Sequence, residues 1–311
     1  MKGFTDSNLE RVIRHACHRE TGELRSSDLA SIRVLHASKS NVCNVDGIEQ
    51  CGNLEWLDLN TNQITDASPI AHLSKLQYLN LDRNRIVDLS PLAALTRIQR
   101  LYLACNPLAD LEPLSNLETL ETLWLHTSNI SNLMALARLT NLSRLSLGYN
   151  HITDVIPLCG LTRLQFLRMP SNDIVDISPL SGLTDLRFLY LNHNRIMDVS
   201  PLSQLSKLED LTLSVNRIVD ISPLSSLSGV KWLHLSNNRI SDLTPLSGQT
   251  RLLALCLEHN RIEDITPLLK NAGLVAESVV RLKGNWLDLR PGSTSMQCIE
   301  KLRQRGVSIG Y

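Results

Sequence analysis

Four side chains with metal-ligand chemistry lie near one another in the C-terminal part of the sequence: His234, Cys256, Glu258 and His259. Imidazole, thiolate and carboxylate groups bind zinc, but a zinc ion needs three or four of them converging at about 2.0 to 2.3 Å. His234 and Cys256 are 22 residues apart, and the chain repeats with that period. They should therefore lie on adjacent coils of a flat sheet, where ligands converge poorly. We interpret the four as ordinary polar surface and expect no metal and no cofactor.

The sequence contains no nucleophile elbow, phosphate-binding loop or HExxH motif. Aspartate recurs too regularly to be catalytic, at Asp66, Asp88, Asp110, Asp154, Asp176, Asp198, Asp220, Asp242 and Asp264. Four arginines, Arg195, Arg217, Arg239 and Arg261, each lie three residues before one of these aspartates. We expect local ion pairs there rather than a track for nucleic acid. The sequence predicts no enzyme.

Composition excludes several classes of partner. The 31 basic and 31 acidic residues balance, with a pI near 7.1, so nothing favours attraction to nucleic acid or an anionic membrane. No segment approaches the roughly 18 apolar residues of a membrane span, and no signal peptide is evident. The seven cysteines are odd in number and follow no spacing. We therefore expect reduced thiols and a cytoplasmic protein, with secretion by a non-classical route as the alternative.

One 22-residue unit generates nearly the whole chain. Its clearest copy, residues 189–208, reads LxLxxNxIxDxxPLxxLxxL. Asparagine recurs in that register at Asn62, Asn84, Asn106, Asn150, Asn172, Asn194, Asn216, Asn238 and Asn260, and serine replaces it at Ser40 and Ser128. This period and motif are typical of leucine-rich repeats. We predict an α/β solenoid: a leucine-rich repeat horseshoe with a parallel β-sheet on the concave face, short 3₁₀ turns on the convex face and helical caps at both ends.

Each position of the repeat has an expected structural role. Alternating leucines such as Leu189 and Leu191 point into the core from a short strand. The asparagine amide should bond backbone groups of the adjacent coil that the turn leaves unpaired. A Ser or Thr before a proline, as at Ser178-Pro179, should cap and start one turn of 3₁₀ helix. The repeat around Ser128 departs most, and we expect a local irregularity there.

The ends of the chain differ from the repeats. We expect an N-terminal helical cap over residues 1–31, with an amphipathic helix in residues 4–19 capped by Asp6 or Ser7. About eleven coils should fill residues 32–272. An irregular last repeat and a C-terminal cap, with a helix that ends at Gly306, should occupy residues 273–311. Since neighbouring repeats share one core, we count a single continuous domain and expect a monomer.

Aromatic residues are concentrated in the outward-facing positions of the predicted strands. Eight of the twelve fall there, although leucine and isoleucine already fill the core. Exposed aromatic and arginine side chains on one face are typical of interface hot spots. The alternative is that the rings only stabilise the sheet as cross-strand pairs. The predicted binding residues are Trp56, Tyr78, Tyr102, Trp124, Tyr149, Phe166, Arg168, Phe188, Tyr190, Trp232 and His234.

The N-terminal motifs FxDxNLE at residues 4–10, GIE at 47–49, NLE at 53–55 and NQITD at 62–66 accompany the repeat. With them, residues 4 to 270 resemble the bacterial internalin-type leucine-rich repeat proteins. Known internalins are surface or secreted ligands that hold host receptors on the concave face. The resemblance therefore implies protein binding by that face. The internalins' signal peptide, immunoglobulin-like region and wall anchor are not found in the sequence.

We therefore expect a non-enzymatic protein-protein interaction module that binds a protein or peptide partner on its concave face. Solenoids suit this role because they present a long rigid surface that loses little freedom on binding. The alternative is a regulatory subunit or a translocated bacterial effector that modulates a host enzyme. We expect no binding to nucleic acid or to membranes.

Overall fold

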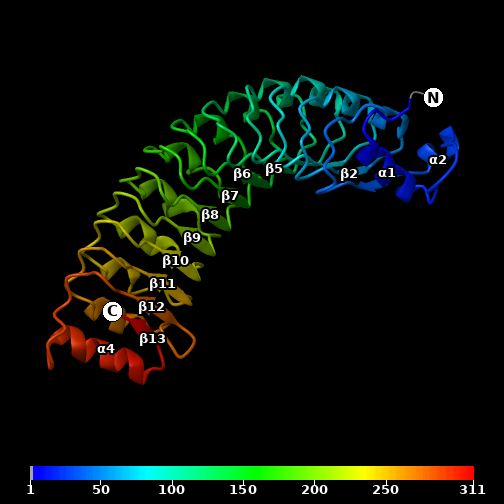
Figure 1. Ribbon diagram of the computed structural model, residues 1–311. Coiled ribbons are helices and arrows are strands. Elements are labelled where there is room, and N and C mark those ends of the chain that lie inside the picture. The colour runs from blue at the N-terminus through cyan, green and yellow to red at the C-terminus, as the bar shows by residue number, and fades with distance from the viewer. Residues whose placement is uncertain (1–2) are drawn as a thin grey trace. The chain divides into compact units, whose positions relative to one another are not determined.

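The computed structural model describes residues 3–311, and the chain divides into two compact units, one ending at His151 and the other spanning Ile152–Tyr311. Each unit is a stack of coils with one three-residue strand per coil (Figure 1). The first unit holds β1 (Val34–His36), β2 (Trp56–Asp58), β3 (Tyr78–Asn80), β4 (Arg100–Tyr102), β5 (Thr122–Trp124) and β6 (Arg144–Ser146). The second holds β7 (Phe166–Arg168), β8 (Phe188–Tyr190), β9 (Asp210–Thr212), β10 (Trp232–His234), β11 (Ala254–Cys256), β12 (Val279–Arg281) and β13 (Ser308–Gly310).

Consecutive strands within each unit pair in parallel, and the register follows the repeat. Leu189 pairs with Leu211, the equivalent residue of the next coil. The central residue of each strand is buried, whereas its neighbours point to the outer face of the sheet, since side chains alternate along a strand. After β11 the register changes, because three inserted residues make Ala254 pair with Val279. Every outward column of the sequence therefore becomes a row of spatial neighbours within its unit.

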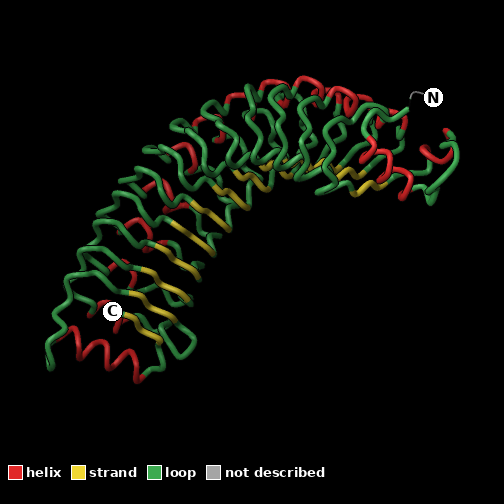
Figure 2. Tube along the Cα trace, in the orientation of Figure 1, coloured by secondary structure: helices red, strands yellow, loops and turns green. Residues whose placement is uncertain are grey.

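Short helical turns lie on the side of each unit opposite the strands, as the yellow and red segments of Figure 2 show. They are the 3₁₀ helices η1 (Ile48–Gln50), η2 (Ser68–His72), η3 (Ser90–Ala94), η4 (Glu112–Leu114), η5 (Met134–Leu136), η6 (Ile156–Leu158), η7 (Ser178–Leu180), η8 (Ser200–Gln204), η9 (Ser222–Ser226) and η10 (Thr244–Leu246), and the α-helix α3 (Thr266–Lys270). The predicted leucine-rich repeat architecture is confirmed.

The prediction that a hydroxyl group caps these turns is wrong. The serine or threonine is the first residue of the turn, and no side chain caps the turn from the residue before it. The aspartate two residues earlier does so instead: Asp176 Oδ1 accepts from Ser178 N at 2.8 Å and Asp176 Oδ2 accepts from Ser178 Oγ at 2.9 Å. A carboxylate with two oxygens satisfies both donors of one serine, which the serine cannot do for itself.

The predicted pairing of each arginine with the aspartate three residues later is also wrong. Arg195 instead forms an ion pair with Asp173, one coil back, at 2.5 Å. The aspartates of that column are already engaged by the following serine or threonine, as Asp242 is by Thr244 N at 2.8 Å. Within residues 3–311, none of the four arginines pairs with its predicted aspartate. Arg195 and Asp173 pair because stacking brings residues of adjacent coils together, although they are far apart in the sequence.

Helices precede the first strand and follow the last full repeat. They are α1 (Ser7–Ala16), α2 (Ser26–Ala30) and α4 (Thr294–Gln304). Asp6 caps α1 by accepting from Asn8 N at 2.8 Å, while its other oxygen accepts from Cys43 N at 2.7 Å. One carboxylate thus starts the helix and ties it to the first coil. No helix in the described part of the chain is long and apolar enough to cross a membrane.

The asparagine column connects successive coils, as predicted. Asn194 Nδ2 donates to the carbonyls of Leu191 and Met169, both at 3.0 Å. Its side-chain oxygen accepts from Ile174 N at 3.1 Å. These backbone groups are buried and would otherwise lack partners, so the amide stabilises the turn that follows each strand. The outer face of the strands is the surface that this scaffold leaves free.

Candidate functional site

Aromatic rings gather on the outer face of the first unit. Trp56 and Tyr78 are register partners and stack with their centroids 3.4 Å apart and their planes 2° from parallel. The ring centroid of Tyr102 lies 5.3 Å from that of Tyr78 and also 5.3 Å from that of Trp124, its register partner. His126 continues the series 6.0 Å from Trp124. We call these five residues the aromatic ridge. It crosses the sheet from the first residue of β2 and β3 to the last residue of β4 and β5, and ends at His126 beyond β5.

The ridge runs obliquely across the strands because the position of the aromatic residue within the strand changes between β3 and β4. Trp56 and Tyr78 begin their strands, whereas Tyr102 and Trp124 end theirs. Each ring of the series contacts the next, so the rings support one another and hide much of their faces. The ridge therefore presents a narrow apolar surface made chiefly of ring edges.

Acidic and amide side chains border the ridge. Asp58 Oδ1 accepts from Asn60 N at 3.0 Å, and Asp82 Oδ1 accepts from Ala104 N at 2.7 Å. Burial raises the pKa of Asp82 to about 6, although the hydrogen bond from Ala104 opposes the shift. Burial likewise raises the pKa of the Tyr78 hydroxyl. The ridge thus combines apolar contact area with hydrogen-bond acceptors.

A second group of rings, the aromatic cluster, lies on the second unit and consists of Phe166, Phe188 and Tyr190. The Phe166 ring lies 6.3 Å from that of Phe188 and 5.6 Å from that of Tyr190. The Tyr190 hydroxyl donates to Asp210 Oδ2 at 2.8 Å. Burial, together with this bond to a carboxylate, raises the pKa of Tyr190. Arg168 is the register partner of Tyr190, so a positive charge adjoins the cluster.

Three further predicted binding residues belong to neither of these two groups. Trp232 starts β10 beside Asp210, and the Lys231 ammonium lies 5.9 Å from its ring centroid. His234 ends β10 beside Cys256. Tyr149 lies in the turn after β6, with 55% of its surface exposed and a positive φ of 57°. The structure thus joins most of the predicted residues into a ridge and a cluster and leaves these three at their margins.

The metal-like constellation does not converge on one point. Glu258 accepts a hydrogen bond from the Ser236 hydroxyl, and His259 adopts a positive φ in the turn beyond β11. Among residues 3–311, no group of three or more His, Cys, Asp or Glu side chains could hold a metal ion. The arrangement on these coils offers polar contacts and no coordination chemistry.

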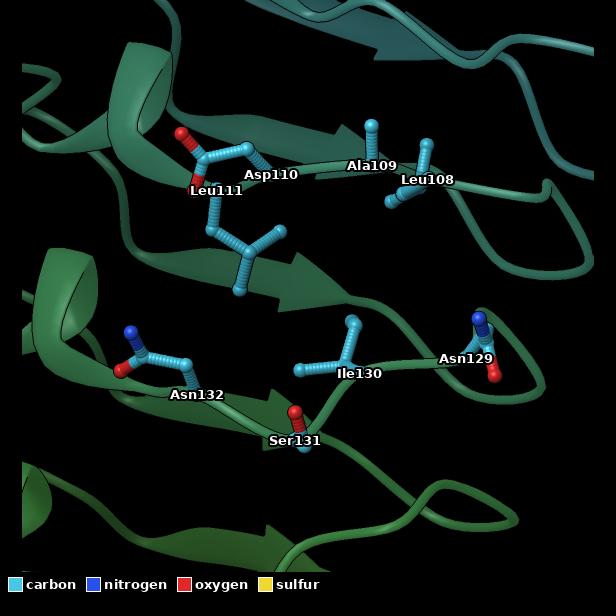
Figure 3. A pocket seen from close by; sticks show the side chains of 8 residues that line it. All are labelled: Leu108, Ala109, Asp110, Leu111, Asn129, Ile130, Ser131 and Asn132. Carbon is cyan, nitrogen blue, oxygen red and sulfur yellow. The ribbon is translucent and has the colours of Figure 1, made fainter.

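The sequence predicted only an irregularity around Ser128, and the structure has a recess of about 70 Å³ there, between two coils of the first unit. Figure 3 shows Leu111 and Ile130 extending into the gap from opposite coils, with Asp110 and Asn132 at one end and Asn129 at the other. Leu108 and Ile130 are each 5% exposed there, whereas Ile86 and Ile152, which occupy the same position in flanking repeats, are fully buried. The two coils have therefore separated locally.

One substitution accounts for a hydrogen bond that is missing across the recess. In other coils the column asparagine accepts from a backbone nitrogen of the preceding coil, as Asn150 Oδ1 does from Ile130 N at 3.0 Å. Ser128 lacks an amide oxygen, and Leu108 N bonds to Asn106 O within its own coil instead. Ser128 was therefore the signal in the sequence that could have located the opening.

Comparison with known proteins gives consistent matches. The family model described as leucine-rich repeats (2 copies) matches residues 52–94, 184–226 and 228–270. An internalin, InlF, from Listeria monocytogenes str. 4b F2365 is 32% identical, with 98% of this chain and 95% of that one covered and a TM-score of 0.83. Internalin C2 from the same organism is 33% identical, with 75% and 94% covered and a TM-score of 0.59. Among curated proteins, none matches this chain.

A more distant similarity concerns the fold alone. The leucine-rich repeat ectodomain of the plant membrane receptor kinase GASSHO1/SCHENGEN3 from Arabidopsis thaliana is 22% identical, with 77% of this chain and 34% of that one covered and a TM-score of 0.61. That structure contains the ectodomain in complex with CASPARIAN STRIP INTEGRITY FACTOR 2. The repeat fold is therefore shared with that ectodomain.

Proposed function

The chain belongs to the internalin family of leucine-rich repeat proteins, and from this premise we propose that it is a non-enzymatic recognition module whose partner binds the outer face of its strands. The partner is a folded protein or an extended peptide. Leucine-rich repeat proteins are generally protein-protein interaction modules. The proposal adds the surface and the residues that make the contact.

One observation carries the proposal: in each unit, rings that the core does not need gather on the outer face of the strands, as the ridge in the first unit and the cluster in the second. Trp124 and Tyr102 in the ridge, and Phe188 and Tyr190 in the cluster, are all partly exposed. Aromatic side chains provide large contact areas and lose little conformational entropy on binding, and they dominate interface hot spots. A sheet needing only internal stability would not require this concentration on one face.

The structure also supports a binding role over a catalytic one. Two acids on this face, Asp58 and Asp82, are engaged by nearby backbone and side-chain amides. The recess at Leu111 and Ile130 has a volume of only about 70 Å³. A long rigid surface with grouped rings suits the recognition of another chain.

The test begins with affinity capture on the immobilised full chain and identification of the retained protein by mass spectrometry. The purified partner is then titrated against variants by calorimetry. We expect Phe188→Ala combined with Tyr190→Ala, and Tyr102→Ala combined with Trp124→Ala, to weaken binding by at least tenfold for the patch that is used, since each truncated hot spot costs about 2 kcal/mol or more.

The matched control is Gln204→Ala in η8, on the side of the unit opposite the strands. This exposed residue should leave the affinity unchanged. If both aromatic double variants retain the wild-type affinity while remaining folded by circular dichroism, the outer face is not the binding surface. If Gln204→Ala alone weakens binding, the partner docks on the helical side.

A further inference from the structure

One carboxylate on the second unit is surrounded by aromatic residues. Asp210 begins β9, and its register partners on either side are Phe188 of β8 and Trp232 of β10. The Tyr190 hydroxyl reaches across from β8 to donate to Asp210 Oδ2 at 2.8 Å. We call these four residues the Asp210 box. Strands about 4.8 Å apart place all four side chains within reach of a single bound group.

The second oxygen of this carboxylate lacks a partner. Asp210 Oδ1 is almost inaccessible to solvent and accepts no hydrogen bond in the described chain. A buried acceptor without a donor is destabilising, and more so when the group is charged. Since such atoms are rare in native structures, an unpaired carboxylate oxygen on a surface rich in hot-spot residues requires an explanation.

Three cations adjoin the box: Arg168, the register partner of Tyr190, and Arg187 and Lys231. Arg187 and Lys231 do not supply the missing donor, because another acid holds them. Glu209, the residue before Asp210, accepts from Lys231 Nζ at 2.9 Å and from Arg187 Nε at 2.7 Å. Those two cations already lie near the box rings: Arg187 is 5.8 Å from the Phe188 centroid and Lys231 is 5.9 Å from the Trp232 centroid. The chain thus neutralises Glu209 twice and leaves Asp210 unpaired by any cation.

We propose that the Asp210 box binds an arginine side chain of the protein partner. A guanidinium group offers five N–H donors in a plane, stacks on aromatic rings and pairs with carboxylates. It would donate to Asp210 Oδ1 and lie against the rings of Phe188 and Trp232, where it gains cation-π attraction. Because Oδ1 is covered in the free chain, binding requires the covering side chains to change rotamer, which is a fast side-chain motion.

The inference rests on the proposed function and deepens it by naming the chemistry of one contact. It also assigns Tyr190 a positioning role. Its hydroxyl holds Oδ2, so the carboxylate stays oriented while Oδ1 receives the ligand. A neutral ligand of the same shape would satisfy fewer of these groups, since it brings neither the charge nor the full set of donors.

The test uses the full chain and two small probes, N-acetyl-arginine methylamide and its neutral isostere N-acetyl-citrulline methylamide. Binding is followed by ¹H–¹⁵N NMR at the Trp232 indole resonance, assigned with a Trp232→Phe variant. We expect the arginine probe to shift this resonance saturably at millimolar concentration and the citrulline probe to bind at least tenfold more weakly. Asp210→Asn, which retains an acceptor for the Tyr190 hydroxyl, should weaken arginine binding at least tenfold.

Two further variants keep the result interpretable. Asp185→Asn removes an exposed aspartate of the same unit that pairs with Lys207, and should leave probe binding unchanged. Tyr190→Phe keeps the carboxylate and a ring but removes the bond that orients the carboxylate, so it should weaken arginine binding by less than Asp210→Asn does. Equal binding of both probes, or full arginine binding by a folded Asp210→Asn variant, would overturn the inference.

The identified protein partner separates failure of this inference from failure of the proposed function. If Phe188→Ala combined with Tyr190→Ala abolishes capture but Asp210→Asn leaves the partner affinity unchanged, the face binds its partner without an arginine in the box. If Asp210→Asn reduces that affinity at least tenfold, and changing one arginine of the partner to citrulline reduces it equally, the assignment stands.

Discussion

The side-chain oxygen of Asn194 lies 3.1 Å from the backbone nitrogen of Ile174, one coil earlier in the stack. The same amide donates to Met169 O in that earlier coil and to Leu191 O in its own coil. One buried side chain therefore joins two coils by two hydrogen bonds and secures the turn of its own coil by a third. The stack is stabilised by this repeated contact as well as by its leucine core.

Replacing Asn194 by alanine should destabilise the protein by about 3 kcal/mol, because it leaves buried backbone groups unsatisfied. Asn192, two residues earlier on the outer face, makes no such side-chain contacts and provides a control of the same type. Urea unfolding followed by circular dichroism measures both. An equal loss for Asn192→Ala and Asn194→Ala would contradict the assigned role of the column.

Restoring the missing asparagine of the column at Ser128 should stabilise the protein. Ser128→Asn supplies an oxygen for Leu108 N and an amide for Leu103 O, and should stabilise the chain by about 1 kcal/mol while narrowing the recess. Slower hydrogen exchange of the Leu108 amide would report the new bond. Ser131→Asn, at an exposed position on the same coil, should not change the stability.

The aspartate cap of the 3₁₀ turns predicts an order of effects. Asp198 accepts from both Ser200 N and Ser200 Oγ. Asp198→Ala loses both bonds and should destabilise the chain by about 1 kcal/mol, the usual size of a capping contribution. Ser200→Ala loses only the hydroxyl bond and should cost less. Thermal unfolding of the two variants gives the comparison, and the reverse order would restore the hydroxyl as the capping group.

Asp82, beside the ridge, should make the stability of the protein depend on pH. Burial raises its folded-state pKa to about 6, above the ordinary value of 3.8. The folded state therefore binds the proton more tightly, so this contribution is present at low pH and is lost as the pH rises from about 4 to 6. In wild type the free energy of unfolding should fall by between about 1 and 3 kcal/mol for this reason over that pH range. Asp82→Asn should not show this fall. Urea midpoints measured from pH 4 to 7 test it.

Asp88 supplies a control of opposite sign. Hydrogen bonds from Ser90 hold the pKa of its exposed carboxyl below the usual range. Its contribution is therefore present above the unfolded-state pKa and is lost as the pH falls through the lower folded-state value. Asp88→Asn should therefore be less stable than wild type at neutral pH, and this difference should shrink only as the pH falls below about 4. Asp82→Asn should instead match wild type at low pH and be the more stable of the two at neutral pH. Identical pH profiles for the two variants would contradict both assignments.

Much of the scaffold could be predicted because it depends on period alone. The spacing of Leu189, Leu191 and Asn194 predicted a strand, its buried face and the turn after it, and each coil repeats the same local physics. The outward positions of Phe188 and Tyr190 followed from alternation along the strand. The recess at Ser128 was predicted only as an irregularity, since the size of a gap depends on how far neighbouring coils relax.

By itself, the amino-acid sequence determined which residues are buried, which face outward and which positions become neighbours one coil apart, because a constant repeat leaves no other way to bury the leucines. Only the tertiary structure decided which polar partner each outward side chain takes. Arg195 reaches Asp173 rather than Asp198, Asp176 caps the turn rather than Ser178, and Tyr190 holds one oxygen of Asp210 while the other stays unpaired. These choices depend on differences of a few ångströms between side chains of adjacent coils, and hydrogen bonds and ion pairs weaken steeply over such distances.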